Sequence, residues 1–315
     1  FGERLKENEP LARYTTFKIG GPADLFVEVK TAEELKNAVI AARSNDLPVF
    51  LLGGGTNILV GDKGIRGLVI KNSTSNIAIA GMRGNVKAGQ NVGDVYVEAE
   101  SGVPMNKLVR FTIEEGLGGL EMQLGLPGSV GGAVYMNSKW TNPVGYVGDA
   151  VYQAMILTPD NEVKVVPHSY FQFAYDTSTI QKSGDIVLTV TFALTRANKD
   201  ALWDIANRSI AYRRDSQPQG VLSPGCTFRN ISRAEAMSVP TPNHTTSAGF
   251  LVDHAGMKGK TVGKAQISPI HANFIVNTGQ ATASDVVQLI EAARAKVKEQ
   301  FGVTLEEEIV RVGEF

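Results

Sequence analysis

Apolar and polar residues follow two different spacings along the first third of the chain. Short apolar runs bounded by turn residues predict strands over 24–29, 49–52, 68–70 and 85–88. Residues 31–43 repeat at helical spacing, and Thr31 with Glu34 forms the capping-box pattern of a helix start. Residues 94–115 predict an amphipathic helix interrupted near Pro104. This region therefore alternates between predicted strands and helices.

The rest of the chain changes from strands back to helices. Turn residues separate strands predicted over 154–157, 163–166 and 186–194. Helices are predicted over 199–214 and 284–301, the second with Ser284 as its N-cap, and 303–312 has a strand-like pattern. The polar, proline-containing stretch 215–224 reads as a linker or a functional loop. Together the elements predict an α+β fold with three lobes.

Composition narrows this picture mainly by exclusion. The chain has 315 residues and a formal net charge of −1, from 31 basic and 32 acidic residues, which argues against binding to nucleic acid or a membrane surface. One cysteine excludes a disulfide framework, and the four histidines have no metal-site spacing. No apolar stretch approaches the roughly 20 residues of a spanning helix, and no signal peptide is visible. We expect a cytoplasmic protein without a metal.

Glycine is the unusual component of the composition, with 33 residues that include three clusters, at 19–23, 53–57 and 125–133. Adjacent glycines leave backbone N–H groups unobstructed, and such backbone can form a nest for phosphates. The spacing matches neither a P-loop nor a Rossmann fingerprint. Any one cluster is equally well interpreted as a tight turn between strands. Three clusters in one chain favour a site for a dinucleotide pyrophosphate.

Longer motifs around these clusters resemble one enzyme family in the order in which they occur. They are YTTFKIGGPAD (14–24), LLGGGTNILV (51–60), GLEMQLGLPGSVGGAVYMN (119–137), AGFLVDHAGMKGKTVGKAQIS (248–268), HANFIVNTGQAT (271–282) and FGVTLEEEIVRVG (301–313). They closely resemble the UDP-N-acetylenolpyruvoylglucosamine reductases, bacterial flavoenzymes that make UDP-N-acetylmuramic acid for peptidoglycan. The resemblance therefore implies an oxidoreductase of cell wall biogenesis, which also serves cell shape and cell division.

The resemblance also implies a fold and a cofactor. The fold is of the vanillyl-alcohol-oxidase type, with FAD-binding lobes at 1–73 (joined by the tail 303–315) and 74–197, and a substrate-binding lobe at 198–302. FAD is the bound cofactor, NADPH is the hydride donor, and we expect a cytoplasmic monomer. The residues implied to bind FAD are Gly53, Gly54, Gly55, Thr56, Asn57, Ile58, Gly125, Pro127, Gly128, Ser129, Gly131, Gly132 and Ala133.

The implied reaction adds a hydride to the vinyl carbon distal to the ether oxygen and then a proton to the carbon beside the carboxylate. The family's proton donor is a serine in a G-S-x-F-[KR] pattern, and Cys226 occupies that position here. A thiol, with a reference pKa of about 8.5, is protonated at neutral pH and can replace it. The alternative is that Cys226 is a small buried residue, which is the more common fate of a free cysteine.

Other site residues follow from the same resemblance, with one departure. Glu308 matches the catalytic glutamate, with Glu306 as the fallback, and Tyr175 matches a catalytic tyrosine. Asp176 stands where the family has an arginine, and an ionised carboxylate would oppose an enolate. Cations that could substitute are Lys139, Arg213, Arg214 and Arg229; alternatively, Glu308 in its acid form stabilises the enolate.

Substrate contacts are implied at two further positions, and the substrate loop departs from the family. Asn230 matches a residue that contacts the nucleotide sugar, and His271 lies near another. The NSKW segment at 137–140 replaces a stretch of small residues. Two alternatives stay open: another FAD-dependent oxidoreductase of the same fold, or a nucleotide-binding homologue whose catalysis is impaired by the change at Asp176.

Overall fold

The computed structural model describes residues 1–87, 90–141 and 144–315, and the chain divides into two compact units. Unit 1 comprises residues 1–4, 27–54 and 70–213, and unit 2 comprises residues 5–26, 55–69 and 214–315. Each unit has its own hydrophobic core of buried aliphatic and aromatic side chains. The predicted division into three lobes, at 1–73 with 303–315, 74–197 and 198–302, stays a prediction.

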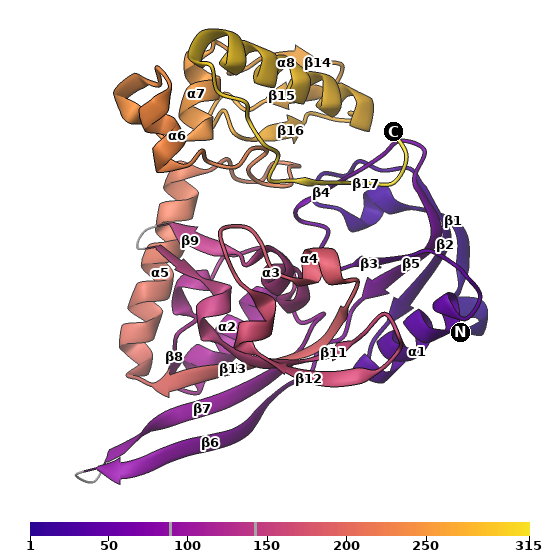
Figure 1. Cartoon of the computed structure of the whole chain (residues 1–315), viewed down its shortest axis with the longest axis vertical. Helices are drawn as coiled ribbons and strands as arrows, with labels where there is room; N and C mark the ends of the chain where they lie inside the picture. The colour runs from indigo at the N-terminus through magenta and orange to yellow at the C-terminus, as the bar shows by residue number, and fades with distance from the viewer. Residues whose placement is uncertain (88–89, 142–143) are drawn as a thin grey trace. The chain divides into compact units, whose positions relative to one another are not determined.

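Unit 1 is built around an antiparallel sheet with the strand order β12-β11-β13-β7-β6, and β8 pairs with β13 (Figure 1). Its strands are β6 (Ile77–Lys87), β7 (Gln90–Glu100), β8 (Leu117–Gly118), β11 (Val151–Leu157), β12 (Val163–Pro167) and β13 (Ile186–Arg196). The helices of this unit are α1 (Ala32–Arg43), α2 (Met105–Glu114), α3 (Val130–Met136) and α4 (Ile180–Ser183), and α5 (Lys199–Ser216) begins in it. The strands predicted over 154–157, 163–166 and 186–194 are thus confirmed.

The helix predicted over 94–115 is wrong in its first half. Residues up to Glu100 belong to β7, and the helix α2 begins only at Met105. Val95, Val97 and Ala99 are buried at alternate positions, which is the spacing of a strand, because β7 lies between β6 and β13 in the sheet. The strand predicted over 85–88 is part of β6 as far as residue 87, and Ala88 lies outside the described residues.

The start of α1 shows the predicted cap in a modified form. The Thr31 hydroxyl accepts a hydrogen bond from the Glu34 N–H at 3.1 Å, as a capping box requires. The Glu34 carboxylate, however, accepts from the N–H of Lys30 at 2.9 Å. Both bonds satisfy donors at the helix entrance, so the short sequence signal predicted this element correctly.

Unit 2 contains a three-stranded antiparallel sheet, β14-β15-β16, against which the long helix α8 packs (Figure 1). Its elements are β14 (Thr261–Val262), β15 (Ala265–Ile267), β16 (Ile275–Asn277), α6 (Arg233–Ser238), α7 (Ala248–His254) and α8 (Ala283–Phe301). The N-cap of α8 is Thr282, which forms a capping box with Asp285, and not Ser284 as predicted. Thr282 precedes the first apolar residue of the helix face, Ala283, which is fully buried.

Shorter ladders complete the fold. A four-stranded sheet has the order β1-β2-β5-β3, β4 pairs in parallel with β17, and β9 pairs with β10. Their bounds are β1 (Lys6–Pro10), β2 (Pro22–Val29), β3 (Val49–Leu52), β4 (Ile58–Val60), β5 (Ile65–Asn72), β9 (Lys139–Thr141), β10 (Val144–Tyr146) and β17 (Val310–Val312). The strands predicted over 24–29, 49–52 and 68–70 are confirmed. In the described parts of the chain, no helix has the length and apolar character needed to cross a membrane.

Candidate active site

The first glycine cluster is a close approach of backbone to backbone in unit 2. A Cβ at Gly21 would lie 2.2 Å from the carbonyl oxygen of Asp62, and the Gly21 N–H donates to the carbonyl of Gly61 at 3.0 Å. Only glycine fits so close to another main chain. The glycines of this cluster are therefore explained by a close contact between two segments of the main chain, which is neither a tight turn nor a phosphate site.

The other two clusters meet each other in unit 1. A Cβ at Gly53 would lie 2.5 Å from the hydroxyl oxygen of Ser129, so the absence of a side chain lets the loop at 53–54 lie against the loop that opens α3. Ser129 is the N-cap of α3, and its hydroxyl accepts from the Gly132 N–H at 3.4 Å. Gly53 and Ser129, which come from the two loops implied to bind FAD, therefore lie next to each other.

The two loops differ in whether their backbone N–H groups already donate to an acceptor within the protein, and only N–H groups without one remain available to an anion. At the start of α3, the N–H of Val130 donates to Val103 and the N–H of Gly131 donates to Ser101, at 2.8 and 2.7 Å. By contrast, the N–H groups of residues 53–56 donate to no acceptor within the described ranges. A run of such donors fits a phosphate, because buried or half-buried N–H groups need an acceptor.

A cation lies directly beside this loop. The ammonium group of Lys71, on β5 in unit 1, donates a hydrogen bond to the carbonyl oxygen of Gly53. Burial of the Lys71 side chain lowers the pKa of this ammonium from its ordinary value. Lys71 is not among the residues predicted from the sequence. Its place directly after the apolar run 68–70 was the available signal, since it puts a charge at the end of a predicted strand.

Unit 2 brings the segments of Cys226 and Glu308 together as neighbouring antiparallel strands. Phe228 bridges to Glu307, the N–H of Glu308 donates to the carbonyl of Thr227 at 2.8 Å, and the N–H of Arg229 donates to Glu306 at 2.9 Å. The residue directly opposite Glu308 is therefore Thr227, and the half-buried Cys226 lies one position further along. These residues are about 80 positions apart in the sequence, so only the fold makes them neighbours.

Two asparagines hold these strands in register. Asn273 brackets Phe228, because its side-chain oxygen accepts from the Phe228 N–H at 2.9 Å and its amide donates to the Phe228 carbonyl at 2.8 Å. The amide of Asn57 donates to the carbonyl of Glu308 at 3.1 Å, and its own carbonyl accepts from Val310 at 2.9 Å. Asn273 was missed by the sequence analysis, although it lies within a quoted motif.

Tyr175 lies in unit 1, beside one of the cations proposed to replace the family's arginine. The Lys139 ammonium is 3.7 Å from the centre of the Tyr175 ring, a cation–π contact. The buried side chain of Asn137 joins the two segments, donating to the Ala174 carbonyl at 2.9 Å. Asp176 is buried and adopts left-handed backbone, with φ of 54°. Residues 142 and 143 of the substrate loop lie outside the described residues.

The two substrate-binding residues predicted in unit 2 have identifiable local partners. The side-chain oxygen of Asn230 accepts from the N–H of Ala248 at 3.1 Å, in the first turn of α7. The Nδ1 atom of His271 accepts from the Asn273 N–H at 3.2 Å, and burial lowers the pKa of the His271 ring. The ring is thus neutral at neutral pH, with its proton on Nε2.

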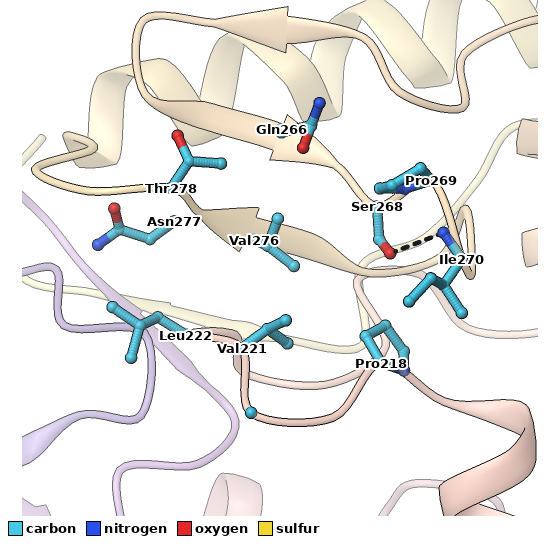
Figure 2. A pocket seen from close by; sticks show the side chains of 11 residues that line it. Pro218, Val221, Leu222, Gln266, Ser268, Pro269, Ile270, Val276, Asn277 and Thr278 are labelled. Atoms are coloured by element: carbon cyan, nitrogen blue, oxygen red, sulfur yellow. Dashed lines mark hydrogen bonds between the residues drawn. The ribbon is translucent and has the colours of Figure 1, made fainter.

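A cavity of about 360 Å³ lies in unit 2 between the loop at 218–222 and the strands β15 and β16 (Figure 2). Apolar side chains such as Leu222, Ile270 and Val276 line it, together with the hydroxyl of Ser268, which accepts from the Ile270 N–H at 3.1 Å. The loop at 218–222 shortly precedes Cys226 in the sequence, and Ile270 on the opposite wall directly precedes His271. Among the residues described, no cluster of three or more His, Cys, Asp or Glu is arranged to hold a metal ion.

Comparison with known proteins extends over nearly the whole chain. A family model described as "UDP-N-acetylenolpyruvoylglucosamine reductase, C-terminal domain" matches residues 217–312, and one described as "FAD binding domain" matches residues 23–166. The chain is 36% identical over 312 residues to the UDP-N-acetylenolpyruvoylglucosamine reductase of Clostridium botulinum, with 98% of this chain and 92% of that protein covered. It is 37% identical over 310 residues to that of Halalkalibacterium halodurans, with 98% and 95% covered.

A solved structure gives the same result at the level of the fold. The crystal structure of UDP-N-acetylenolpyruvylglucosamine reductase from Thermus caldophilus matches with a TM-score of 0.76 and 32% identity. The match covers 98% of this chain and 99% of that one. Both the sequence and the fold therefore match this family over nearly the whole of the chain.

Proposed function

Because the chain belongs to the UDP-N-acetylenolpyruvoylglucosamine reductase family, we propose that it reduces UDP-N-acetylglucosamine enolpyruvate to UDP-N-acetylmuramic acid. It uses FAD as its cofactor and NADPH as its hydride donor, in the synthesis of a peptidoglycan precursor. The observation that supports this most directly is the pairing of the Cys226 and Glu308 segments through the bond from the Glu308 N–H to Thr227. NADPH oxidation by the purified yellow protein that depends on the enolpyruvyl substrate is the test.

The residues at the glycine loops fit a flavin dinucleotide. The N–H groups of residues 53–56 have no acceptor among the described residues, and they precede Asn57 and Ile58 in a loop of small side chains. Lys71 adds a cation beside Gly53, and Ser129 contributes the second loop. We expect the pyrophosphate to accept hydrogen bonds from the first loop, since the donors at the start of α3 are already used.

Replacing Lys71 with methionine should weaken FAD binding about tenfold, which corresponds to about 1.4 kcal/mol. The substitution keeps the apolar stem of the side chain and removes the positive charge next to the candidate pyrophosphate site. The measurement is the dissociation constant of FAD from the apoprotein, followed by flavin fluorescence at two salt concentrations. Lys164→Met removes an exposed lysine of the same unit and serves as the control. Equal FAD affinity in both variants contradicts the assignment.

In the proposed reaction Cys226 supplies a proton, and Glu308 stabilises the negative charge that develops on the substrate. A bound flavin supplies the hydride chemistry of the reduction. Cys226 holds a proton on Sγ at neutral pH and donates it to the carbon next to the substrate carboxylate. Glu308 in its acid form donates a hydrogen bond to the oxygen on which negative charge develops, and Tyr175, Asn230 and His271 hold the substrate.

Of the four cations that could stand in for the family's arginine, Lys139 has the most favourable position. Its ammonium lies over the ring of Tyr175, the residue that precedes Asp176, and both belong to unit 1. Arg213 is instead placed 4.6 Å from the ring centre of Trp140. The two departures from the family, a lysine in the NSKW segment and an aspartate at 176, therefore occur at adjacent places in the fold. We infer that Lys139 supplies the positive charge.

Replacing Lys139 with methionine should slow substrate reduction about 100-fold, at the lower end of the effect of removing one stabilising donor at a developing anion. Reduction of the flavin by NADPH should change less than twofold. Stopped-flow measurement of the two half-reactions separates these effects. Lys139→Arg keeps the charge and the contact with Tyr175 and should recover most of the rate. Lys182→Met, an exposed lysine on α4, is the control. A Lys139→Met rate equal to this control contradicts the inference.

Asp176 also supports a second candidate, a nucleotide-binding homologue with impaired catalysis. Such a protein binds UDP-sugars and FAD but does not couple NADPH oxidation to the enolpyruvyl substrate. The test of the proposed function therefore also decides between these two. A monomer in size-exclusion chromatography is expected for either.

A further inference from the structure

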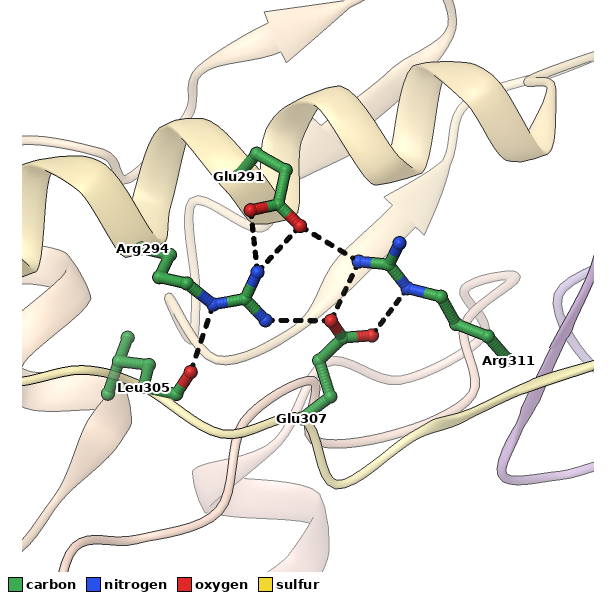
Figure 3. Close-up of polar contacts among 5 residues, drawn as sticks. All are labelled: Glu291, Arg294, Leu305, Glu307 and Arg311. Atoms are coloured by element: carbon green, nitrogen blue, oxygen red, sulfur yellow. Dashed lines mark hydrogen bonds and ion pairs between the residues drawn. The ribbon is translucent and has the colours of Figure 1, made fainter. Parts of the chain in front are cut away.

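Four charged side chains from α8 and the C-terminal tail form one hydrogen-bonded group, here called the tail cluster (Figure 3). Arg311 contacts both carboxylate oxygens of Glu307, each at 2.7 Å, and Arg294 donates to the same carboxylate at 2.7 Å. Glu291 accepts from Arg294 at 2.6 Å and from Arg311 at 3.1 Å. Arg294 also donates to the backbone carbonyl of Leu305 at 3.0 Å.

Burial distinguishes the tail cluster from ordinary surface ion pairs. The side chain of Glu307 is only 17% exposed, against 69% for Glu299, which pairs with Lys296 on the same helix. Bidentate arginine–carboxylate pairs that are partly buried hold a defined geometry, whereas exposed lysine pairs contribute little. Hydrogen bonds from Arg294 lower the pKa of the Glu291 carboxyl from its ordinary value. The tail is thus anchored to α8 at Glu307.

The anchored residue precedes Glu308 directly. Phe228 and Glu307 form an isolated antiparallel bridge, and the chain bends at Glu308 and Ile309 before β17 begins. The backbone of Glu308 is bonded on both sides, through its N–H to Thr227 and through its carbonyl to Asn57. Fixing the Glu307 side chain against α8 therefore also fixes the place of Glu308.

The sequence makes this anchor necessary. Residues 306–308 are three consecutive glutamates, so a shift of this segment by one residue would put another glutamate in the place of Glu308. The hydrogen bonds to the backbone of this segment do not distinguish the three glutamates, because no glutamate side chain takes part in them. The two hydrogen bonds from the Arg311 guanidinium and the one from Arg294 are instead made to the Glu307 carboxylate, so they distinguish this glutamate from its neighbours.

We propose that Glu307, held by Arg294 and Arg311, is a positioning residue that keeps Glu308 in register with the strand of Cys226. The inference rests on the proposed function for the role of Glu308. It assigns to the tail cluster the task of directing the catalytic carboxylate, in addition to any contribution to stability.

Hydrogen–deuterium exchange on the FAD-bound protein tests the register without any substrate. In Arg311→Ala, amides in the peptide that covers 303–312 should exchange at least tenfold faster, because the Glu308 N–H loses its fixed partner. Arg311→Lys retains the positive charge but cannot form the bidentate pair, so its exchange rate in this peptide should lie between those of the wild type and Arg311→Ala. Lys296→Ala, which breaks the exposed pair on the same helix, should leave this peptide unchanged. Unchanged exchange in Arg311→Ala overturns the proposal.

The two half-reactions test the consequence for catalysis. We expect substrate reduction to slow about tenfold in Arg311→Ala, with KM within threefold of the wild type and flavin reduction by NADPH within twofold. A merely structural role would lower both half-reactions or neither. Glu307→Gln should behave like Arg311→Ala, and it carries the test if Arg311→Ala does not fold. A substrate-reduction rate equal to that of Lys296→Ala overturns the proposal, whereas a wild type that fails to reduce the substrate contradicts the proposed function itself.

Discussion

Replacing Cys226 with alanine should slow reduction of the enolpyruvyl substrate by about 1,000-fold while FAD binding and reduction of the flavin by NADPH stay intact. General acid catalysis by a positioned side chain contributes in this range. Cys226 is half-buried and lies on the strand that pairs with the Glu308 segment, so its loss removes a proton donor without opening the core. Stopped-flow absorbance of the flavin measures the two half-reactions separately.

The serine variant is the matched control for this experiment. Cys226→Ser restores the hydroxyl of the family pattern and should retain activity, since a hydroxyl at the same atom can donate the proton. A Cys226→Ala variant that turns over at the wild-type rate would exclude Cys226 as the proton donor. In that case the more common role of a free cysteine, a small packing residue, would apply.

Local signals predicted those elements whose residues have the spacing and the caps that are typical of the secondary structure they form. Thr31 and Glu34 marked the start of α1, and the apolar run at 49–52 matched β3 to the residue. The failure at 94–115 has a specific cause. Alternation at Val95, Val97 and Ala99 has a period of two, and the turn residues Ser101 and Gly102 separate it from the helical period after Pro104. Of the two partners of β7, β6 directly precedes it in the sequence, and only β13 lies far away.

The family, the α+β fold and the FAD-binding part were predictable because they depend on ordered motifs, and the comparisons confirm them. Within the site, residue spacing could not show that Gly53 would lie against Ser129, or that Gly21 would lie against the backbone of Gly61 and Asp62. Lys71 was missed because a lysine at the end of a strand is normally solvated. Such contacts join residues from different segments, and no local pattern encodes them.

The position of Glu308 depends on interactions that reach it from three directions. Its backbone is bonded to Thr227 on the strand of Cys226 and to Asn57 at the end of the second glycine cluster. Its neighbour Glu307 is bonded to α8 through Arg294. The segment of Cys226, the residue Asn57 and the helix α8 are therefore all connected to the tail within one residue of Glu308. This arrangement predicts larger losses of activity from changes at Glu308 than from changes at Glu307 or Glu306.

Replacing Glu308 with glutamine should slow substrate reduction by about 100-fold with little change in the affinity for UDP-N-acetylglucosamine enolpyruvate. The amide keeps the shape of the side chain and can still donate an N–H hydrogen bond, but it is a weaker donor to a developing anion than a carboxylic acid and carries no ionisable proton. Rapid-quench measurement of product formation from pre-reduced enzyme isolates this step. Thermal unfolding should be nearly unchanged, because the backbone bonds to Thr227 and Asn57 remain.

Glu306→Gln is the matched control, since it removes the same group two residues away on the same segment. The side chain of Glu306 is exposed, and its backbone carbonyl accepts from the N–H of Arg229, so this variant should keep at least half of the wild-type rate. A large loss in Glu306→Gln and a small loss in Glu308→Gln would reverse the assignment and make Glu306 the catalytic carboxylate. Equal losses would mean that the charge of the segment matters more than the direction of one side chain, and the role assigned to the tail cluster would fail with it.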